Sequence, residues 1–367
     1  MKRVWRKYLS EAVLAPLSYV YKAVVVTRNW MFDSHLLPQQ EMDVPVVSVG
    51  NINVGGTGKT PHTEYIVEAL SHEYRVGVLS RGYKRKTIGF ILATSKLTPR
   101  DLGDEAYQVY RKFGNKITLA VCEDRRHGIK EMLRLDPSIN VIVLDDAFQH
   151  RYVKPRVNIV LVDYSHPIRE DKLLPWGTLR EPVSGILRAD IVVVTKCPHT
   201  LRPMDINLIK ARLDLFPSQN LFFSSIQYYN LMPVFPEMAS NIPSLQQLNH
   251  NDCQLIVTGI AKHLPLVKFL KAFKTSIKVL HFSDHHNFSR DDFSKMKKVF
   301  DQMSGNRKII VTTEKDAVRM ANNPYFPHEL KRYIFYVPIK VDFNRPVADQ
   351  DFIGSIKKMM ADKVRIR

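Results

Sequence analysis

A glycine-rich segment between an apolar run and a helix-compatible stretch is the feature that most constrains how this chain can fold. The segment, residues 48–60, reads SVGNINVGGTGKT; the β-branched run 44–49 leads into it and the stretch 62–71 follows it. Such a loop between a strand and a helix is the context of a phosphate-binding loop, because successive backbone N–H groups and the helix N-terminus attract anions. The segment therefore predicts an α/β fold whose first strand leads into a phosphate site.

Within this loop, Lys59 is expected to reach the β- and γ-phosphates of a nucleotide, and the Thr60 hydroxyl to bind Mg²⁺. Asn53 stands where the usual pattern has glycine, and asparagine tolerates a left-handed backbone better than most residues. The alternative is a glycine-rich turn that binds nothing. The residues expected around the phosphates are Gly55, Gly56, Thr57, Gly58, Lys59, Thr60 and Pro61.

Short β-branched runs recur along the chain, and most are separated by helix-compatible stretches such as 104–113. Strands buried on both faces that alternate with helices indicate a mostly parallel sheet covered on both sides. The runs lie at 44–49, 75–79, 117–121, 141–144, 159–162 and 191–195, and the pattern resumes at 254–257, 277–282 and 308–312.

The resulting fold prediction is a P-loop NTPase-type parallel-sheet domain and a smaller α/β domain, joined by a β-strand linker. The expected units are an N-terminal helical segment 1–37, a phosphate-loop domain 38–220, a linker 221–245 and a C-terminal domain 246–367. The aromatic run 333–343 could pair with the linker strand. A length of 367 residues agrees with about two domains.

The charge balance predicts an anionic partner, because Lys and Arg number 54 against 36 Asp and Glu, a net charge of +18. With 45% hydrophobic residues the chain is not a disordered one. Its three cysteines have no paired spacing, which argues against a cysteine metal site and indicates a reducing compartment.

The first 28 residues carry six basic side chains and one acid, Glu11, among apolar and aromatic residues. Their longest uncharged run, 12–21, is about half of what a transmembrane helix needs. One interpretation is an amphipathic helix in a membrane interface, with Lys and Arg at anionic headgroups. The other is an ordinary amphipathic helix packed on the domain. Pro16 is expected to interrupt a helix here.

A second polar feature is the strand end in 140–150, NVIVLDDAFQH, which places Asp145 and Asp146 after an apolar run. Beside a phosphate loop, such carboxylates typically hold Mg²⁺ or its water, because the metal prefers hard oxygen ligands. The alternative for this pair alone is a solvated turn.

Together these segments resemble the tetraacyldisaccharide 4'-kinases of lipid A biosynthesis. The loop by itself is common to many enzymes, but its combination with DDAFQH and LREP is specific. The segments that carry the resemblance occur in the family's order: SVGNINVGGTGKTP at 48–61, VLSRGY at 78–83, GDE at 103–105, VLDDAFQH at 143–150, LPWGTLREP at 174–182, FSDHH at 282–286 and TEKDAVR at 313–319.

The resemblance implies transfer of the γ-phosphoryl group of ATP to the 4'-hydroxyl of an acylated glucosamine disaccharide 1-phosphate, giving lipid IVA. It implies ATP and Mg²⁺ as cofactors, a lipid substrate and contact with a membrane surface. The expected location is the cytoplasmic face of a Gram-negative inner membrane, with peripheral or interfacial anchoring. No nucleic acid is expected as a partner, and no obligate protein partner is evident.

By the same resemblance, Asp104 is the base that takes the hydroxyl proton, with His285 as its partner from the other domain, while Lys59 stabilises charge on the phosphates. Without the resemblance, Asp104 could cap the helix that follows, and His285 could be a surface residue. Glu181 is expected as a further magnesium ligand or as a residue that orients one, alongside Thr60, Asp145 and Asp146.

Recognition of the acceptor needs cations for its 1-phosphate, and arginine suits bidentate contacts with phosphate. Any one of these arginines could instead be a plain surface charge. The residues expected to bind the acceptor are Arg81, Arg125, Gln149, His150 and Arg180.

Two other functions remain as alternatives. A membrane-associated P-loop ATPase of the partitioning or metal-chaperone kind explains the loop and the acidic strand end, but not Asp104, LREP or the second domain. A nucleic-acid-binding module is suggested by the charge alone; the basic residues are dispersed and carry no recognition pattern for RNA or DNA.

Overall fold

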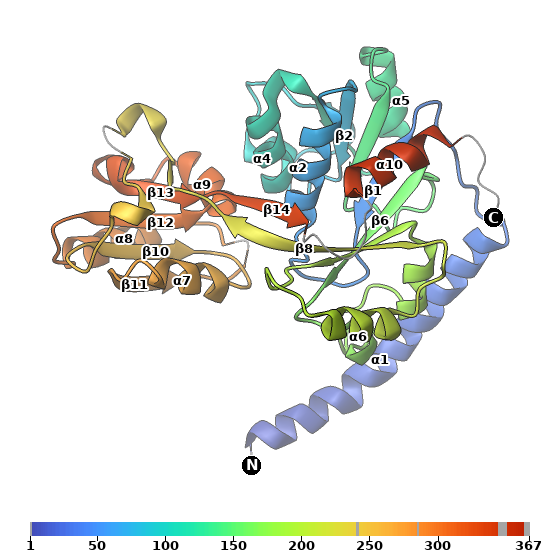
Figure 1. The fold of residues 1–367 in the computed structure, drawn as a ribbon, viewed down its shortest axis with the longest axis horizontal. Helices are drawn as coiled ribbons and strands as arrows, with labels where there is room; N and C mark the ends of the chain where they lie inside the picture. The colour runs from blue at the N-terminus through green and yellow to red at the C-terminus, as the bar shows by residue number, and fades with distance from the viewer. Residues whose placement is uncertain (1, 240–241, 285, 344–350, 363–367) are drawn as a thin grey trace.

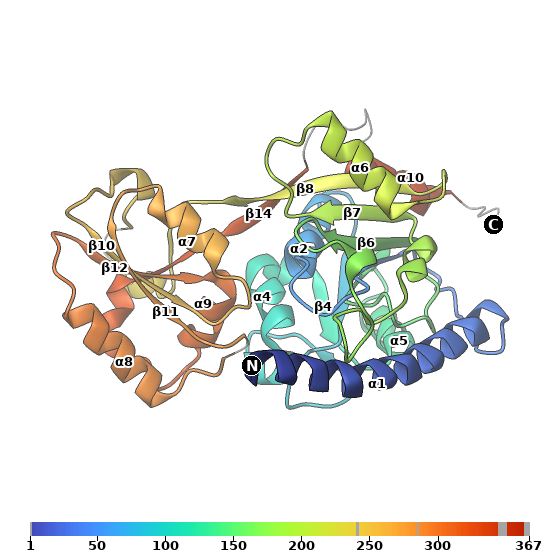
Figure 2. The ribbon, with the colours of Figure 1, turned by 90° about the horizontal axis from the view of Figure 1, so that it is seen from below.

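The computed structural model describes residues 2–239, 242–284, 286–343 and 351–362. Two α/β units lie side by side, and the strands β8 and β14 extend from the larger unit toward the smaller one (Figure 1). A long N-terminal helix, α1 (Lys2–Asp33), runs across the larger unit (Figure 2).

The larger sheet has nine strands in the order β14-β8-β7-β6-β1-β5-β2-β4-β3. Its seven central strands are parallel, while β14 and β3 are antiparallel edge strands. Its strands are β1 (Val46–Gly50), β2 (Val76–Ser80), β3 (Ile91–Leu92), β4 (Thr118–Val121), β5 (Val141–Asp145), β6 (Val157–Asp163), β7 (Ile191–Thr195), β8 (Asn220–Tyr228) and β14 (Ile339–Phe343).

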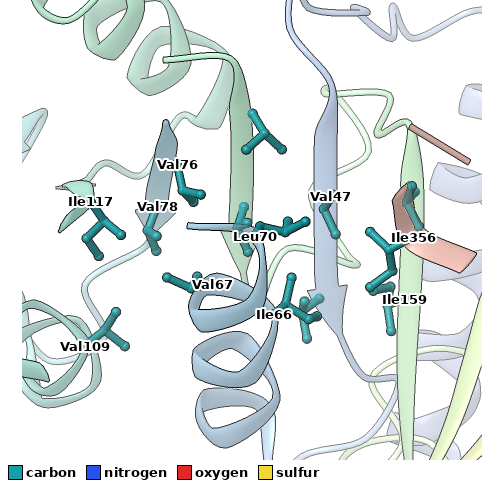
Figure 3. Close-up of a cluster of buried hydrophobic side chains, with 14 of the residues drawn as sticks. Val47, Ile66, Val67, Leu70, Val76, Val78, Val109, Ile117, Ile159 and Ile356 are labelled. Carbon is teal, nitrogen blue, oxygen red and sulfur yellow. The ribbon is translucent and has the colours of Figure 1, made fainter. Parts of the chain in front are cut away.

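Helices cover both faces of this sheet, which explains the uninterrupted apolar runs of β1, β2, β5 and β7. On one face, Val47 and Val78 of the strands pack against Ile66, Val67 and Leu70 of α2 (Figure 3). The helices of this face are α2 (Lys59–Leu70), α4 (Asp104–Phe113) and α10 (Phe352–Ala361), and those of the other face are α5 (Arg125–Leu135) and α6 (Pro203–Leu213). A one-turn helix, α3 (Pro99–Leu102), precedes α4.

The smaller sheet has five strands in the order β11-β10-β12-β13-β9, parallel except for β9. Helices pack on both of its faces as well, α8 and α9 on one and α7 on the other. Its elements are β9 (Met232–Pro233), β10 (Cys253–Thr258), α7 (Leu264–Lys271), β11 (Ser276–His281), α8 (Arg290–Asp301), β12 (Lys308–Thr313), α9 (Glu314–Ala321) and β13 (Ile334–Val337).

Each expected run overlaps a strand. The expected domain limits, however, need a correction at the C-terminal end. β14 pairs with β8 in the larger sheet, and α10 buries Ile356 in the core of the larger unit (Figure 3). The expectation that 246–367 form one domain is therefore wrong for these last elements. The segment 221–245 is not a separate linker either, because β8 is a full strand of the larger sheet and β9 one of the smaller. The expected pairing of 333–343 with this segment is confirmed.

The N-terminal helix continues through Pro16, contrary to the expected interruption. Pro16 is exposed, and the helix is held by contacts beyond it: Ser18 Oγ donates to Leu173 O at 2.8 Å, Tyr21 Oη to Arg180 O at 2.8 Å, and Phe32 is fully buried. Among the described residues, no helix is long and apolar enough to cross a bilayer.

The assignment of α10 to the larger core predicts that Ile356→Ala destabilises the protein by about 2–5 kcal/mol, because it leaves a cavity at a fully buried position. Lys358→Ala, at an exposed site on the same helix, should change stability by less than about 0.5 kcal/mol. Denaturant unfolding measures both. Equal stability of the two variants would contradict this packing.

Candidate active site

The expected phosphate loop connects β1 to α2, as its sequence predicts. Gly58 precedes α2 with φ of 89°, a left-handed backbone that favours glycine, and Lys59 begins the helix. Asn53 does not adopt a left-handed backbone, so that reason for tolerating it is wrong. Instead Asn53 is buried and forms an isolated antiparallel β-bridge with Leu179. Beside it, Val54 N donates to Thr178 O at 2.6 Å, so residues 171–181 lie next to the loop.

Two residues at the end of β7 brace the loop from its other side. Thr195 Oγ1 donates to the carbonyl of Thr57 at 2.8 Å, and the Lys196 ammonium donates to the carbonyl of Gly56. Lys196 also contacts Asp163 at the end of β6, at 2.8 Å. Because these hydrogen bonds orient the loop carbonyls toward β7, they favour a conformation in which the N–H groups of the loop face the phosphate position.

The Lys59 ammonium lies between the loop and the acidic strand end. Its Nζ is 3.3 Å from Asn51 Oδ1 and 3.5 Å from Asp146 Oδ1. Asp145 ends β5, and its Oδ1 accepts a hydrogen bond from Thr63 of α2 at 3.0 Å. Thr60 lies one turn before Thr63, so the expected magnesium ligands Thr60, Asp145 and Asp146 gather between β5 and the start of α2.

Asp145 is buried, and its pKa is raised to about 7, chiefly by this burial and then by the negative charges of Glu105 and Asp146. Lys59 and the hydrogen bond from Thr63 act in the opposite direction. A carboxylate that is costly to ionise beside a second carboxylate is an environment in which a divalent cation would be favoured.

The expected acceptor residues line the same edge of the sheet. Arg180 Nη1 is 3.2 Å from Asp146 Oδ1 and 3.4 Å from Gln149 Oε1, and Gln149 Nε2 donates to Asn51 O at 2.8 Å. Burial, followed by the charge of Arg125, lowers the pKa of His150 to about 4, and its Nε2 accepts from the backbone N–H of Arg125. His150 is therefore neutral near pH 7.

Arg125 is 3% exposed at the start of α5, and its Nη1 donates to the carbonyls of Cys122 and Glu123. Burial is the main cause that lowers its pKa, and the charge of the exposed Arg81 is the next. The positive charges of Arg81 and Arg125 repel each other, and Arg125 Nε is buried and has no hydrogen-bond partner among the described residues. An anion bound here would reduce the repulsion and accept this hydrogen bond.

Glu181 is 1% exposed, and its described contacts are with Arg188 at 2.8 Å and Asn29 of α1 at 3.1 Å. The contact with Asn29 ties Glu181 to the N-terminal helix. The role of Glu181 toward magnesium stays a prediction.

Asp104 is the first residue of α4, and Gly103 is the N-cap, so Asp104 does not cap the helix. Gly103 has φ of 85°, and a Cβ there would lie 2.7 Å from Tyr83 O, which requires glycine where the GDE and SRGY loops touch. The Asp104 carboxylate contacts Arg319 of the smaller unit. The expected partner His285 lies outside the described residues.

A family model for Tetraacyldisaccharide-1-P 4'-kinase matches residues 10–357. The chain belongs to this kinase family. The Tetraacyldisaccharide 4'-kinase of Bacteroides thetaiotaomicron is 48% identical over 355 residues, covering 94% of this chain and 93% of that protein. The Flavobacterium johnsoniae protein of the same name is 40% identical and covers 91% and 93%. A crystal structure of the "apo" form of LpxK from Aquifex aeolicus in complex with ATP has a TM-score of 0.68 at 27% identity, covering 94% of this chain and 96% of that one.

Membership of the tetraacyldisaccharide 4'-kinase family confirms the resemblance and the P-loop NTPase-type fold. Four residues of the site were not predicted from the sequence: Asn51, Thr63, Lys196 and Arg319. Lys196 could have been noticed, because it directly follows a buried strand, where ligands of parallel sheets gather. Arg319 lies one turn from Lys315 in the TEKDAVR segment, and this spacing places both side chains on one face of α9.

That segment forms one of the contacts between the two units; another is the pair of Lys262 with Asp163, at 3.1 Å. Lys315 Nζ is 2.8 Å from Glu105 Oε1 of α4, and Glu314 interacts electrostatically with the buried Glu64 and with Lys112. Burial, then the charge of Glu64, raises the pKa of Glu314 to about 7. Glu64 itself accepts from Gln108 at 2.9 Å and pairs with Lys112 at 2.5 Å.

The raised pKa of Glu314 predicts a pH-dependent effect of Glu314→Gln on stability. The folded state disfavours ionised Glu314, so its cost is absent well below pH 4.5, grows between about pH 4.5 and 7, and is complete above pH 7. The variant should therefore melt at a higher temperature than the unmodified protein at pH 8, and this gain should shrink toward pH 5. Calorimetric melting curves at both pH values test it.

Glu237→Gln, which removes an exposed carboxylate, is the matched control and should give no such pH-dependent gain. A Glu314→Gln protein that is less stable than its parent at pH 8 would show that the ionised carboxylate is favourable in the folded state.

Proposed function

We propose that this protein transfers the γ-phosphoryl group of ATP to the 4'-hydroxyl of a tetraacylated glucosamine disaccharide 1-phosphate, giving lipid IVA. The observation that carries the proposal is the meeting of the phosphate loop and two strand-end carboxylates with a cationic edge. Asp104 begins α4, and the next residue of that helix, Glu105, acts electrostatically on Asp145. Family membership supports the choice of donor and acceptor.

On the donor side, Lys59 and the N-terminus of α2 stabilise charge on the transferring phosphoryl group. Phosphoryl transfer depends mainly on positioning and on neutralising the charge of the equatorial oxygens. The Lys59 ammonium lies 3.5 Å from the Asp146 carboxylate. Nucleotide binding therefore exchanges this carboxylate for phosphate oxygens as the partner of the ammonium.

The donor set fits Mg²⁺, because a hydroxyl and two carboxylates are hard oxygen ligands and Asp145 is destabilised as a bare anion. Thr60, Asp145 and Asp146 would hold the ion, and Glu181 is retained as a further residue for it. When bound, the ion supplies neutralisation of phosphate charge.

On the acceptor side, Asp104 takes the proton of the 4'-hydroxyl as the oxygen attacks the γ-phosphorus. The new O–P bond forms while the bond from the γ-phosphorus to the bridging oxygen of ADP breaks, and the proton ends on the Asp104 carboxylate. His285 is proposed as the partner of Asp104.

Arg81, Arg125 and Arg180 provide cations for the phosphate of the acceptor, and Gln149 and the neutral His150 provide polar contacts for its sugars. Arg125 is fixed by its carbonyl contacts, and its Nε, which has no partner among the described residues, remains as a donor for an anion.

The acyl chains of such an acceptor need an apolar environment, and the N-terminal helix offers one beside the site. Along one stripe of α1, Val13, Leu17, Val20 and Val24 are exposed, while Tyr21 and Arg28 of the same helix contact Arg180 and Gln149. We propose that this stripe enters the interface of a membrane, at the cytoplasmic face of the inner membrane, with the Lys and Arg side chains at anionic headgroups.

Lys59→Ala and Asp104→Asn should each lower kcat for lipid phosphorylation by about 10²–10⁴, since they remove charge stabilisation and the base. Lys96→Ala, which removes an exposed lysine, should retain activity. The assay follows radiolabelled phosphate from ATP into the tetraacylated disaccharide 1-phosphate in detergent micelles.

Titration calorimetry with ATP separates the two roles: Asp104→Asn should bind ATP normally, whereas Lys59→Ala should bind it weakly. Label that appears only as inorganic phosphate in the unmodified protein would instead favour an ATPase switch.

Val20→Asp combined with Val24→Asp should weaken binding to vesicles by at least about tenfold, because each valine is 63% exposed and would lose its burial in lipid. The control is Ile88→Asp, at a site that is 88% exposed but far from α1 in the chain. Co-sedimentation with phosphatidylethanolamine–phosphatidylglycerol vesicles measures the effect. Equal binding of the two proteins would remove the stripe from the membrane contact.

A further inference from the structure

We infer that Arg319, carried by the smaller unit, is a positioning residue that holds the carboxylate of Asp104 in the orientation needed for proton removal. This inference rests on the proposed function, since it takes Asp104 as the base. It assigns to the smaller unit a specific contribution to the chemistry at the edge of the larger sheet.

Among the residues that the structure describes, three oxygen acceptors hold the Arg319 guanidinium. Its Nε lies 2.7 Å from Asp104 Oδ2, and its Nη1 lies 3.1 Å from Asp316 Oδ1 and 3.5 Å from Gly259 O. The side chain is only 8% exposed. A planar, nearly buried guanidinium with partners on two of its edges has little freedom to rotate.

Asp316 fixes the far side of this guanidinium. Its carboxylate is fully buried, and its Oδ2 accepts from Gly259 N at 2.9 Å and from Thr313 Oγ1 at 2.8 Å. Gly259 directly follows β10 and Thr313 ends β12, so both partners lie at one edge of the smaller sheet. The direction of the Arg319 Nε–H is therefore set by the smaller unit and not by Asp104.

Asp104 comes from a different part of the chain, 215 residues away. Its backbone is fixed by Gly103, whose φ of 85° and close approach to Tyr83 O tie it to the loop that carries Arg81. With both backbones fixed, the contact with Arg319 selects one orientation of the carboxylate. A general base must be held in such a defined orientation, because small displacements cost rate.

A neighbouring ion pair makes it possible to distinguish this positioning role from simple attachment of the two units. Lys315, on the same face of α9, pairs with Glu105 of the same helix α4 at 2.8 Å. Both pairs join α9 to α4, but Arg319 contacts the carboxylate of the proposed base. Loss of either pair weakens the attachment, whereas loss of Arg319 also releases Asp104.

The test compares Arg319→Met, Arg319→Lys and Lys315→Met in the full-length protein, with the micellar lipid assay and ATP as the varied substrate. Arg319→Met should lower kcat by about 10–100-fold and leave KM for ATP within about threefold. Arg319→Lys, which keeps a donor and the charge, should recover at least part of the lost kcat. Lys315→Met should stay within about threefold of the unmodified protein.

A second measurement uses Asp104→Asn as the background. If Arg319 acts through Asp104, Arg319→Met should add little to the loss caused by Asp104→Asn, because residues that act as a unit are not additive. If Arg319→Met does not fold, Arg319→Lys replaces it in both measurements, with a smaller loss of kcat that again disappears in the Asp104→Asn background.

Equal kcat for Arg319→Met and Lys315→Met, or losses that multiply with that of Asp104→Asn, would overturn the inference and leave Arg319 as an attachment residue. In either case the unmodified protein still phosphorylates the lipid, so the proposed function stands. An unmodified protein that phosphorylates no lipid would instead overturn the proposed function and this inference with it.

Discussion

The burial of both faces of the larger sheet is the constraint on which the rest of the molecule depends. Strands β1, β2, β5 and β7 are buried at every position, so polar chemistry is largely excluded from their faces. Their carboxyl ends are the place where polar and charged side chains can meet, and parallel strands share that edge. Lys59, Arg81, Arg125 and Asp145 follow or end four neighbouring strands, and this is why they come together although they are far apart in the sequence.

The features that could be predicted from the sequence are those whose cause is local. A buried strand needs a continuous apolar run, and a phosphate loop needs glycines between a strand and a helix, so both are visible in a few consecutive residues. The strand-end pair Asp145 and Asp146 could be placed beside the loop for the same reason. The neutral state of His150 could not be predicted, because it depends on burial and on the charge of Arg125, neither of which is a property of its neighbours in the chain.

Most features that depend on distant packing were missed. The pairing of 333–343 with the segment 221–245 was predicted, but not that β8 and β14 belong to the larger sheet, and nothing in the residues of α10 indicates that it packs in the larger core. The contact of Arg319 with Asp104 is of the same kind. The face of α9 on which Arg319 lies could be predicted from its spacing to Lys315, but its partner, Asp104, could not. The continuation of α1 through Pro16 likewise depends on contacts such as those of Ser18 and Phe32 with the larger unit.

The pairing of β8 with β14 has a mechanical consequence. The chain enters the smaller unit by one of these strands and comes back by the other, so the two crossings form a two-stranded antiparallel ribbon (Figure 1). Such a ribbon resists stretching, because sliding one strand past the other would break its register of hydrogen bonds, whereas bending and twisting preserve them. The smaller unit is thus an insertion between the neighbouring strands β8 and β14. Their ribbon permits the smaller unit to tilt relative to the larger one but opposes its movement away from it.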